Sequence, residues 1–219
     1  MAGEIKTSDA QEIRNPNVEN YKEIKPQEDT SYSDAKDFVN AKMDEIQSSS
    51  ETDDIKNSEN IDNTEYTDDN GKVYRVGNEL TPNNEYKING YEYKTDAQGR
   101  IVEASGKLHM KTHEGRLDIR DTKQDIGKGF EKADDDRGHL IGDQFDGANG
   151  LENIVAQNKD INQGAYKNFE KQLADKVGTG SDVRVSINPE YSGDSHRPDA
   201  LVVNYSIDGK QGMRIFPNP

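Results

Sequence analysis

Two short dipeptides constrain the fold of this chain more than any other feature: Asn89-Gly90 and Asp208-Gly209. Each pairs a residue that tolerates a positive φ angle with a glycine, a composition that favours a two-residue β-hairpin turn. The flanking segments read as strands, and they lie at residues 85–88, 91–94, 200–207 and 212–216. The sequence therefore predicts two antiparallel hairpins, one before the middle of the chain and one near its C-terminal end.

The clearest helical pattern lies between the two hairpins. Apolar residues recur every four positions over residues 161–177, and Gly178 ends the pattern. Asp160 and Gln163 have the spacing of a capping box at its start. Further strands are expected at residues 73–76, 100–104 and 183–187. These elements together predict an α+β domain of antiparallel strands, a central helix and long glycine-containing loops.

The front third of the chain differs in composition from the rest. Residues 1–72 contain 19 acidic and 8 basic residues, a net charge of −11, whereas residues 73–219 have a net charge of −4. The whole chain is only 30% apolar, with a mean hydropathy of −1.11. We therefore expect residues 1–71 to be an acidic, mostly disordered segment and residues 72–219 to be the folded domain. Residues 33–47 alone have helical spacing, which fits a transient helix or a segment that docks to a partner.

The densest group of chemically active side chains lies at residues 134–142. Three carboxylates, one arginine and His139 occupy six consecutive positions there. A histidine can take a proton from water, an arginine can bind phosphate and acidic groups can order a hydrated metal. Asn153, Asn162 and Glu170 follow downstream, the last two on the expected helix. We ask below whether these two stretches form one site.

Other kinds of site are less consistent with the sequence. The chain has no cysteine, which excludes disulfides, thiol catalysis and thiolate-metal sites. His109 and His113 are four residues apart and could share a metal on a helix. Gly106 and Gly115 bracket this segment, however, and no acidic base follows, so exposed histidines on a strand or loop are the preferred interpretation.

The order of the polar residues resembles a known family. The sequence Asp-Arg-Gly-His at residues 136–139, followed by Asn153, Asn162 and Glu170, is similar to that of the DNA/RNA non-specific endonucleases. These are ββα-metal, or His-Me finger, nucleases, so the resemblance implies a ββα-metal core within the antiparallel domain. The Asn89-Gly90 hairpin resembles more closely the EssD-like toxin branch, which is associated with type VII secretion and polymorphic toxins. The same branch is suggested by Arg120, Gln124 and Gly127, and by Tyr191, Arg197, Pro198 and Tyr205 near the C-terminal end.

The resemblance also implies a role for each residue of the motif. His139 would be the general base that deprotonates water, and Arg137 would contact the phosphate. Asn162 would be the one direct protein ligand of a Mg²⁺ ion, for which Mn²⁺ could substitute. Glu170 would hold a metal-bound water, and Asn153 would be a polar neighbour of the site that helps to bind substrate.

The resemblance also implies one further arginine upstream of the motif, where it would stabilise charge in the transition state. Arg120 is the preferred candidate, but spacing alone does not exclude Arg116. The implied activity is Mg²⁺-dependent, sequence-nonspecific hydrolysis of DNA or RNA phosphodiesters, as in a bacterial toxin nuclease.

A second interpretation belongs to a different class of protein. Taken singly, His139, Asn162 and Glu170 would be read as a surface hydrogen-bond pair, a helix-start residue and a solvated charge. The chain is also acidic, whereas a nucleic-acid cleft is usually basic. The alternative is therefore a catalytically inactive binding or immunity-type protein, or an acidic nucleic-acid mimic. The presence of all three residues argues against lost catalysis, and most of the acid lies in the front segment.

The sequence also bears on partners and location. No apolar run has the length of a signal-peptide core or a membrane span. We expect a soluble protein that is secreted or delivered by a non-classical route, with a cytoplasmic location as the alternative. Its expected partners are DNA or RNA as substrate and a cognate immunity protein, and no membrane.

Overall fold

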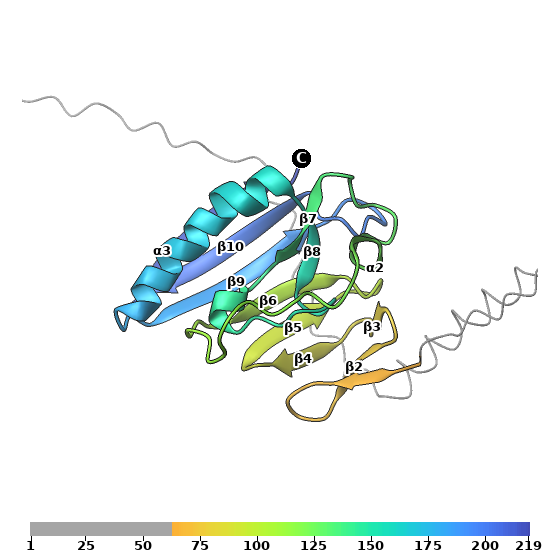
Figure 1. The fold of residues 1–219 in the computed structure, drawn as a ribbon, viewed down its shortest axis with the longest axis horizontal. Helices are drawn as coiled ribbons and strands as arrows, with labels where there is room; N and C mark the ends of the chain where they lie inside the picture. The colour runs from red at the N-terminus through yellow and green to blue at the C-terminus, as the bar shows by residue number, and fades with distance from the viewer. Residues whose placement is uncertain (1–62) are drawn as a thin grey trace, which may run out of the picture.

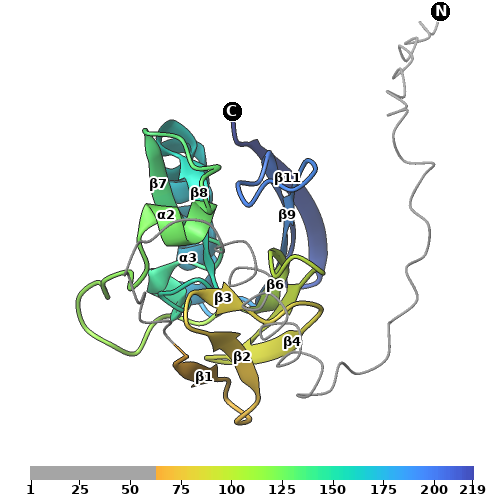
Figure 2. The same ribbon diagram turned by 90° about the vertical axis from the view of Figure 1, so that its right-hand side faces the viewer.

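The computed structural model describes residues 63–219, in which two layers pack against each other (Figures 1 and 2). One layer is a six-stranded antiparallel sheet with the strand order β11-β10-β9-β6-β5-β4. Its strands are β4 (Glu85–Ile88), β5 (Tyr91–Thr95), β6 (Ile101–Lys107), β9 (Val183–Glu190), β10 (Ala200–Ile207) and β11 (Lys210–Pro217). Helix α3 (Lys167–Gly178) and a two-stranded unit form the other layer. The α+β class predicted from the sequence is confirmed, and the predicted features of residues 1–62 lie outside the described range.

Both predicted hairpins are present. Asn89 and Gly90 have φ angles of 54° and 82° and connect β4 to β5 in antiparallel register. Asp208 and Gly209 have φ angles of 50° and 80° and connect β10 to β11 in the same way. Left-handed φ angles at both central residues are what a turn matched to strand twist requires. Local turn chemistry therefore determines these two elements.

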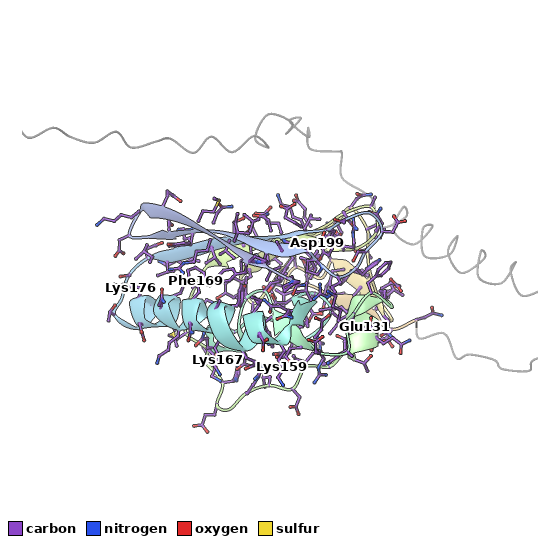
Figure 3. All side chains as sticks on the ribbon, turned by 90° about the horizontal axis from the view of Figure 1, so that it is seen from above. Glu131, Lys159, Lys167, Phe169, Lys176 and Asp199 are labelled. Carbon is purple, nitrogen blue, oxygen red and sulfur yellow. The ribbon has the colours of Figure 1, made fainter. Side chains whose placement is uncertain are left out.

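Aromatic side chains fill the space between α3 and the sheet. Phe169 of α3 is buried, with ring centroids 5.2 Å from Tyr205 and 5.6 Å from Phe216. Figure 3 shows Phe169 between the helix and the sheet, whereas Lys167 lies on the opposite side of the helix. Burying such a side chain contributes about 1.5–3 kcal/mol. Replacing Phe169 with alanine would cost about 3–5 kcal/mol, because a cavity would also remain.

The predicted central helix begins differently from the expectation. Residues Ile161–Tyr166 form a π-helix, η3, which continues directly into α3. The wider π turn carries an extra residue, so Tyr166 is buried while Ala165 of the predicted apolar stripe is exposed. The Tyr166 hydroxyl donates a hydrogen bond to the Leu140 carbonyl at 2.6 Å. This bond attaches the π-helix to the segment that follows His139.

The predicted capping box at the start of this helix is wrong. Asp160 makes no side-chain cap hydrogen bond. The Asn158 side chain instead accepts hydrogen bonds from the backbone nitrogens of Asp160 and Ile161, at 3.0 and 3.2 Å. The Gln163 side chain is instead directed to Asp136, to which its Nε2 atom donates. The cap therefore lies two residues earlier than the spacing suggests.

Strands β7 (Asp135–His139) and β8 (Ile154–Asn158) pair antiparallel and lead into η3 and α3, which together form the ββα unit implied by the family resemblance. Periodicity does not reveal β7, because its residues are mostly charged. Asp135 is fully buried in this strand. Arg197 binds both of its carboxylate oxygens, at 2.7 and 2.9 Å. A bidentate arginine satisfies the carboxylate and so allows a charged residue to be buried in the strand.

A small sheet lies below the main one (Figure 2) and contains β1 (Glu65–Thr67), β2 (Val73–Val76) and β3 (Glu79–Leu80). Strand β1 lies before residue 72, the predicted start of the folded domain. It belongs to the ordered part of the chain because it pairs with β2. Helices α2 (Lys123–Gly127) and η2 (Asp143–Phe145) complete the described elements. Within residues 63–219 no helix is long and apolar enough to cross a bilayer.

Candidate active site

His139 ends strand β7, and only 7% of it is exposed. Its Nε2 atom lies 2.8 Å from Oδ1 of Asn149, in the loop between η2 and β8. An amide oxygen accepts hydrogen bonds and cannot donate one, so neutral His139 carries its proton on Nε2. Nδ1 is then the atom with a lone pair that can accept a proton from water.

The sequence does not identify Asn149 as a functional residue. It lies in a loop between Gly147 and Gly150, with no periodic pattern around it. Its spacing of four residues from Asn153 is the sole signal that could have drawn attention to it. Contact with His139 depends on how this loop folds back along the end of β7, which only the tertiary structure defines.

The environment of His139 favours its neutral form. Burial lowers the pKa of His139, the positive charge of Arg116 lowers it further, and Asn149 and Asp143 act in the opposite direction. The neighbouring aspartates at 134–136 are not among the groups that raise this pKa. Two of them, Asp135 and Asp136, are bound elsewhere, the first by Arg197 and the second by side-chain amides. His139 is therefore suited to act as a base at neutral pH.

Asn162 is held in a defined orientation by strand β7. Its Nδ2 atom donates to Oδ2 of Asp136 at 3.0 Å, and Gln163 donates to the same oxygen at 2.8 Å. Burial raises the pKa of Asp136, but the hydrogen bonds from Gln163 and Asn162 outweigh it and hold this pKa below its usual value. With Nδ2 committed, the amide presents its acceptor oxygen, Oδ1, to another partner.

Glu170 lies on α3, beside Gly142, which follows His139 by three residues. Its Oε1 atom is enclosed and has no hydrogen-bond partner among the described residues. A methyl group at position 142 would lie 2.4 Å from this oxygen, so Gly142 provides the space that Glu170 occupies. Burial raises the pKa of Glu170 to about 8, against the opposing effects of Arg116 and the Gly142 backbone. A hydrated cation could satisfy this enclosed oxygen, and its positive charge would favour the ionised form of Glu170.

The donor atoms of these two residues fit a hard cation. Asn162 and Glu170 offer oxygen atoms, which Mg²⁺ prefers, and Mg²⁺ commonly retains several water ligands. The histidine pair does not form an alternative centre, since the described range contains no cluster of three or more histidine, aspartate or glutamate side chains suited to a metal ion. His109 and His113 lie on a loop, as expected, with His113 Nε2 3.5 Å from Asp146.

The three candidate arginines have different surroundings. Arg137 is exposed, and its Nη1 atom donates to the carbonyl oxygens of Asp121 and Ile119, at 3.0 and 3.3 Å. Arg120 forms an ion pair with Glu152, which is almost completely buried. Arg116 is exposed, and its charge acts on both His139 and Glu170. The charge of Arg116 therefore acts on the site, whereas the side chain of Arg120 is paired with Glu152.

Arg116 belongs to a loop of residues 109–118, called here the arginine loop. Two aspartates of the η2 turn hold it: Asp143 accepts hydrogen bonds from Lys111 Nζ and the Leu117 nitrogen, both at 3.1 Å. Asp146 accepts from the nitrogen and hydroxyl of Thr112. These contacts fix the approach of the arginine loop to His139 from the solvent side.

Asn153 has a structural position and not the predicted contact with substrate. It is fully buried, and its Nδ2 atom donates to the carbonyl oxygens of Ile141 and Ala148 at 2.8 and 2.9 Å. Its Oδ1 atom accepts from the Ile141 nitrogen at 3.0 Å. Both ends of the amide are therefore used to close the loop of residues 147–153, called here the asparagine loop, against the end of β7.

Comparison with known proteins identifies the family. The family model of the DNA/RNA non-specific endonucleases matches residues 82–209, more than half of the chain. The chain therefore belongs to the DNA/RNA non-specific endonuclease family, and its interpretation as an enzyme of this family is confirmed.

Two relatives are similar to parts of the chain. Type VII secretion system protein EssD from Staphylococcus aureus (strain USA300) is 34% identical over 147 residues, which cover 64% of this chain and 24% of that protein. Probable deoxyribonuclease RhsA from Dickeya dadantii (strain 3937) is 28% identical over 126 residues, 56% of this chain and 9% of RhsA. The chain thus spans about a quarter of the length of EssD and less of RhsA.

Two solved nuclease structures also show similarity. NucA from Streptococcus agalactiae, with no metal bound, has a TM-score of 0.47 and 18% identity, covering 62% of this chain and 71% of NucA. Sda1 nuclease with a bound zinc ion has a TM-score of 0.42 and 18% identity, covering 58% of this chain and 75% of Sda1.

Proposed function

We propose that this protein is a Mg²⁺-dependent endonuclease that hydrolyses DNA or RNA phosphodiesters with little sequence preference. The observation that carries the proposal is the pairing of His139 Nε2 with Asn149 Oδ1, at 2.8 Å. It leaves Nδ1 unprotonated in a buried histidine whose pKa is lowered, which is the state a general base needs. His139 would take the proton of the attacking water at Nδ1.

Asn162 and Glu170 are the residues we propose for the metal. Asn162 would bind the cation directly through Oδ1, while Asp136 holds the amide in place. Glu170 would bind one of the waters on the cation through Oε1. A bound Mg²⁺ supplies positive charge that neutralises the phosphate oxygens and the leaving group. Mn²⁺ prefers similar ligands and is expected to substitute.

For the transition-state arginine, the surroundings of the side chains favour another residue than the one preferred from the sequence. We now propose Arg116, and not Arg120, as the residue that stabilises negative charge developing in the transition state. The charge of Arg116 acts on both His139 and Glu170, whereas Arg120 is paired with buried Glu152. Arg137, the arginine of the motif, is exposed and would contact a phosphate of the substrate.

Positive charge near Asn162 supports binding of a polyanion despite the acidic composition. Lys159 and Lys123 both act on Asp136, and Figure 3 shows Lys159 and Lys167 at the exposed side of the helical layer. Such cations would contact backbone phosphates, which gives affinity without reading the base sequence. An inactive nucleic-acid mimic would have no need of an ordered His139–Asn149 pair.

The similarity to EssD supports a toxin nuclease that acts outside the cell that makes it. We propose export through a secretion system, and a cognate immunity protein that protects the producing cell. Co-purification from the producing organism would test the second point. A producing cell that survives the active nuclease without any inhibitor would contradict the proposed immunity protein.

The central experiment is digestion of plasmid DNA and of RNA with Mg²⁺, with EDTA as the control. Cleavage with Mg²⁺, its loss with EDTA and its return with Mn²⁺ are the expected results. Asn162→Ala should raise the Mg²⁺ concentration needed for half-maximal rate, while Gln163→Ala, which removes the second amide on Asp136, should change it less. Cleavage that persists in EDTA would contradict the metal assignment.

A further inference from the structure

A buried ion pair links the small sheet to the loop that contacts His139. Arg75 of β2 donates from Nη1 and Nη2 to the two oxygens of Asp121, at 2.9 and 2.6 Å. The two side chains are only 4% and 5% exposed. Tyr66 of β1 stacks on Arg75, with its ring centroid 4.5 Å from Cζ. The guanidinium is therefore fixed in one orientation by a carboxylate and an aromatic ring.

Asp121 passes this constraint to the asparagine loop. Its Oδ2 atom also accepts a hydrogen bond from the Leu151 nitrogen at 2.8 Å. The adjacent residue, Arg120, donates its backbone nitrogen to the Asn149 carbonyl at 2.9 Å. Asn149 in turn contacts His139. Hydrogen bonds joined by short stretches of backbone therefore connect β2 to the imidazole.

The packing around this chain leaves little freedom. A methyl group at position 150 would lie 2.5 Å from Arg120 Nη2, 2.5 Å from Glu152 Oε2 and 2.9 Å from Asp121 Oδ2. Glycine at this position allows the loop to approach the charged groups closely. The asparagine loop thus has one well-packed position against the ion pair.

We propose that Arg75 is a positioning residue for catalysis: through Asp121 it holds the asparagine loop so that Asn149 keeps His139 in the tautomer with Nδ1 free. The proposal rests on the proposed function, because it takes His139 as the general base. It makes the small sheet a part of the catalytic machinery, although this sheet contributes no group that reacts.

The chemistry of the pair favours positioning over stabilisation. Replacing a buried ion pair with apolar residues of similar volume is often neutral or stabilising, so the pair is weak evidence for a role in stability alone. Its fixed fork geometry, in contrast, defines where the Leu151 nitrogen and hence Asn149 lie. A lysine at position 75 would keep the charge but could not bind both oxygens of Asp121 in one plane.

The matched variants are Arg75→Lys and Arg100→Lys. Arg100 has a similar environment, with Asp96 2.7 Å from Nε and the ring of Tyr191 4.7 Å from Cζ, but it is not connected to His139 by any of these bonds. Both variants should lose comparable stability. The difference between them then isolates the effect on the site.

Two readouts separate positioning from a structural role. In Arg75→Lys, kcat for plasmid cleavage should fall on the order of 10-fold, the scale for a partner that orients a functional histidine. KM should stay within about twofold, because no phosphate contact is removed. Nitrogen NMR of the four histidines, with His139 assigned by difference using His139→Gln, should show one Nε2-protonated tautomer in the parent and a mixture in Arg75→Lys.

The NMR measurement needs no activity, so the two proposals can fail separately. A parent that cleaves nothing but shows the expected tautomer change would overturn the proposed function and support the positioning role. An unchanged tautomer with equal kcat in Arg75→Lys and Arg100→Lys would overturn the positioning role. Should Arg75→Lys fail to fold, Asp121→Asn keeps an acceptor for Leu151 and weakens the arginine contact, and the same outcomes apply to it.

Discussion

The arginine loop and the asparagine loop both approach His139, but they are held in different ways. The asparagine loop is almost completely buried: Glu152 and Asn153 are 1% and 0% exposed, and Asn153 makes three hydrogen bonds to backbone. The arginine loop lies on the surface, with Met110 and Leu117 more than 40% exposed, and two aspartates hold it. A base must keep one orientation, whereas a cation that meets an incoming polyanion must remain accessible. The difference in packing matches this difference in task.

If both loops serve His139, replacing this residue should cause the largest loss of cleavage rate. His139→Ala tests this. Removing a general base should lower the cleavage rate at least about 10²-fold. Initial rates on plasmid and RNA at saturating Mg²⁺ measure the loss. Circular dichroism is the control for folding. A variant that cuts as fast as the parent would remove His139 from the site.

A second test separates the two upstream arginines. Arg116→Ala should lower kcat about 10²-fold, as expected for a group that stabilises transition-state charge, and should leave stability nearly unchanged because Arg116 is exposed. Arg120→Ala should do the reverse, lowering the free energy of unfolding by about 1–3 kcal/mol because buried Glu152 loses the closer of its two arginine partners. Urea unfolding and kinetics on both variants decide the matter. The opposite assignment would follow if Arg120→Ala lost the activity and kept the stability.

The pH dependence of the rate sharpens the comparison further. His139 must be neutral to accept a proton, so the rate should rise with pH and reach a plateau. Burial and Arg116 lower the pKa of His139, so the midpoint should lie below the ordinary value of about 6.5. Below the midpoint the rate should fall about tenfold per pH unit.

Arg116→Ala should move this midpoint to higher pH, because it removes a positive charge that disfavours the imidazolium form. Profiles of kcat/KM for the parent and this variant give both values. A parent midpoint at or above 6.5 would contradict the role of burial and of the arginine loop at His139.

The smallest effect is expected from the front of the chain. Residues 1–62 carry 16 acidic and 7 basic residues, and we propose that they slow association with nucleic acid through diffuse repulsion. Their removal should leave kcat unchanged and lower KM a few-fold at low salt, with the gain fading as the Debye length shortens to about 8 Å at physiological ionic strength. Truncation at residue 62 keeps β1 in the protein.

The gain in KM should be measured at several salt concentrations. A gain that persists undiminished at high salt would point instead to a segment of residues 1–62 that docks at a specific place. The apolar pattern at residues 33–47 would be the first candidate for such a segment.

Local rules of sequence were sufficient for part of this protein. The hairpins at Asn89-Gly90 and Asp208-Gly209 were predicted because turn conformation depends on the two residues themselves. The α3 helix was predicted from its apolar spacing, and the family from the order of the motif residues. Rules that involve only neighbouring residues need no knowledge of the fold.

Competition between partners explains where these rules failed. Gln163 has the spacing of a capping residue, but Asp136 of β7 binds its amide, and Asn158 caps the helix instead. Strand β7 was not predicted from periodicity because Arg197, 62 residues away, neutralises its buried Asp135. A sequence pattern cannot show which distant group will satisfy a polar side chain.

The site divides in the same way. The sequence by itself determined that His139, Asn162 and Glu170 belong to one motif, because their spacing is a property of the chain. Only the tertiary structure decided that Asn149 contacts His139, that Asn153 is buried, and that the charge of Arg116 acts on His139. The physical reason is that these three outcomes depend on how two loops fold back on β7, and each loop is positioned by hydrogen bonds from elements far away in the sequence.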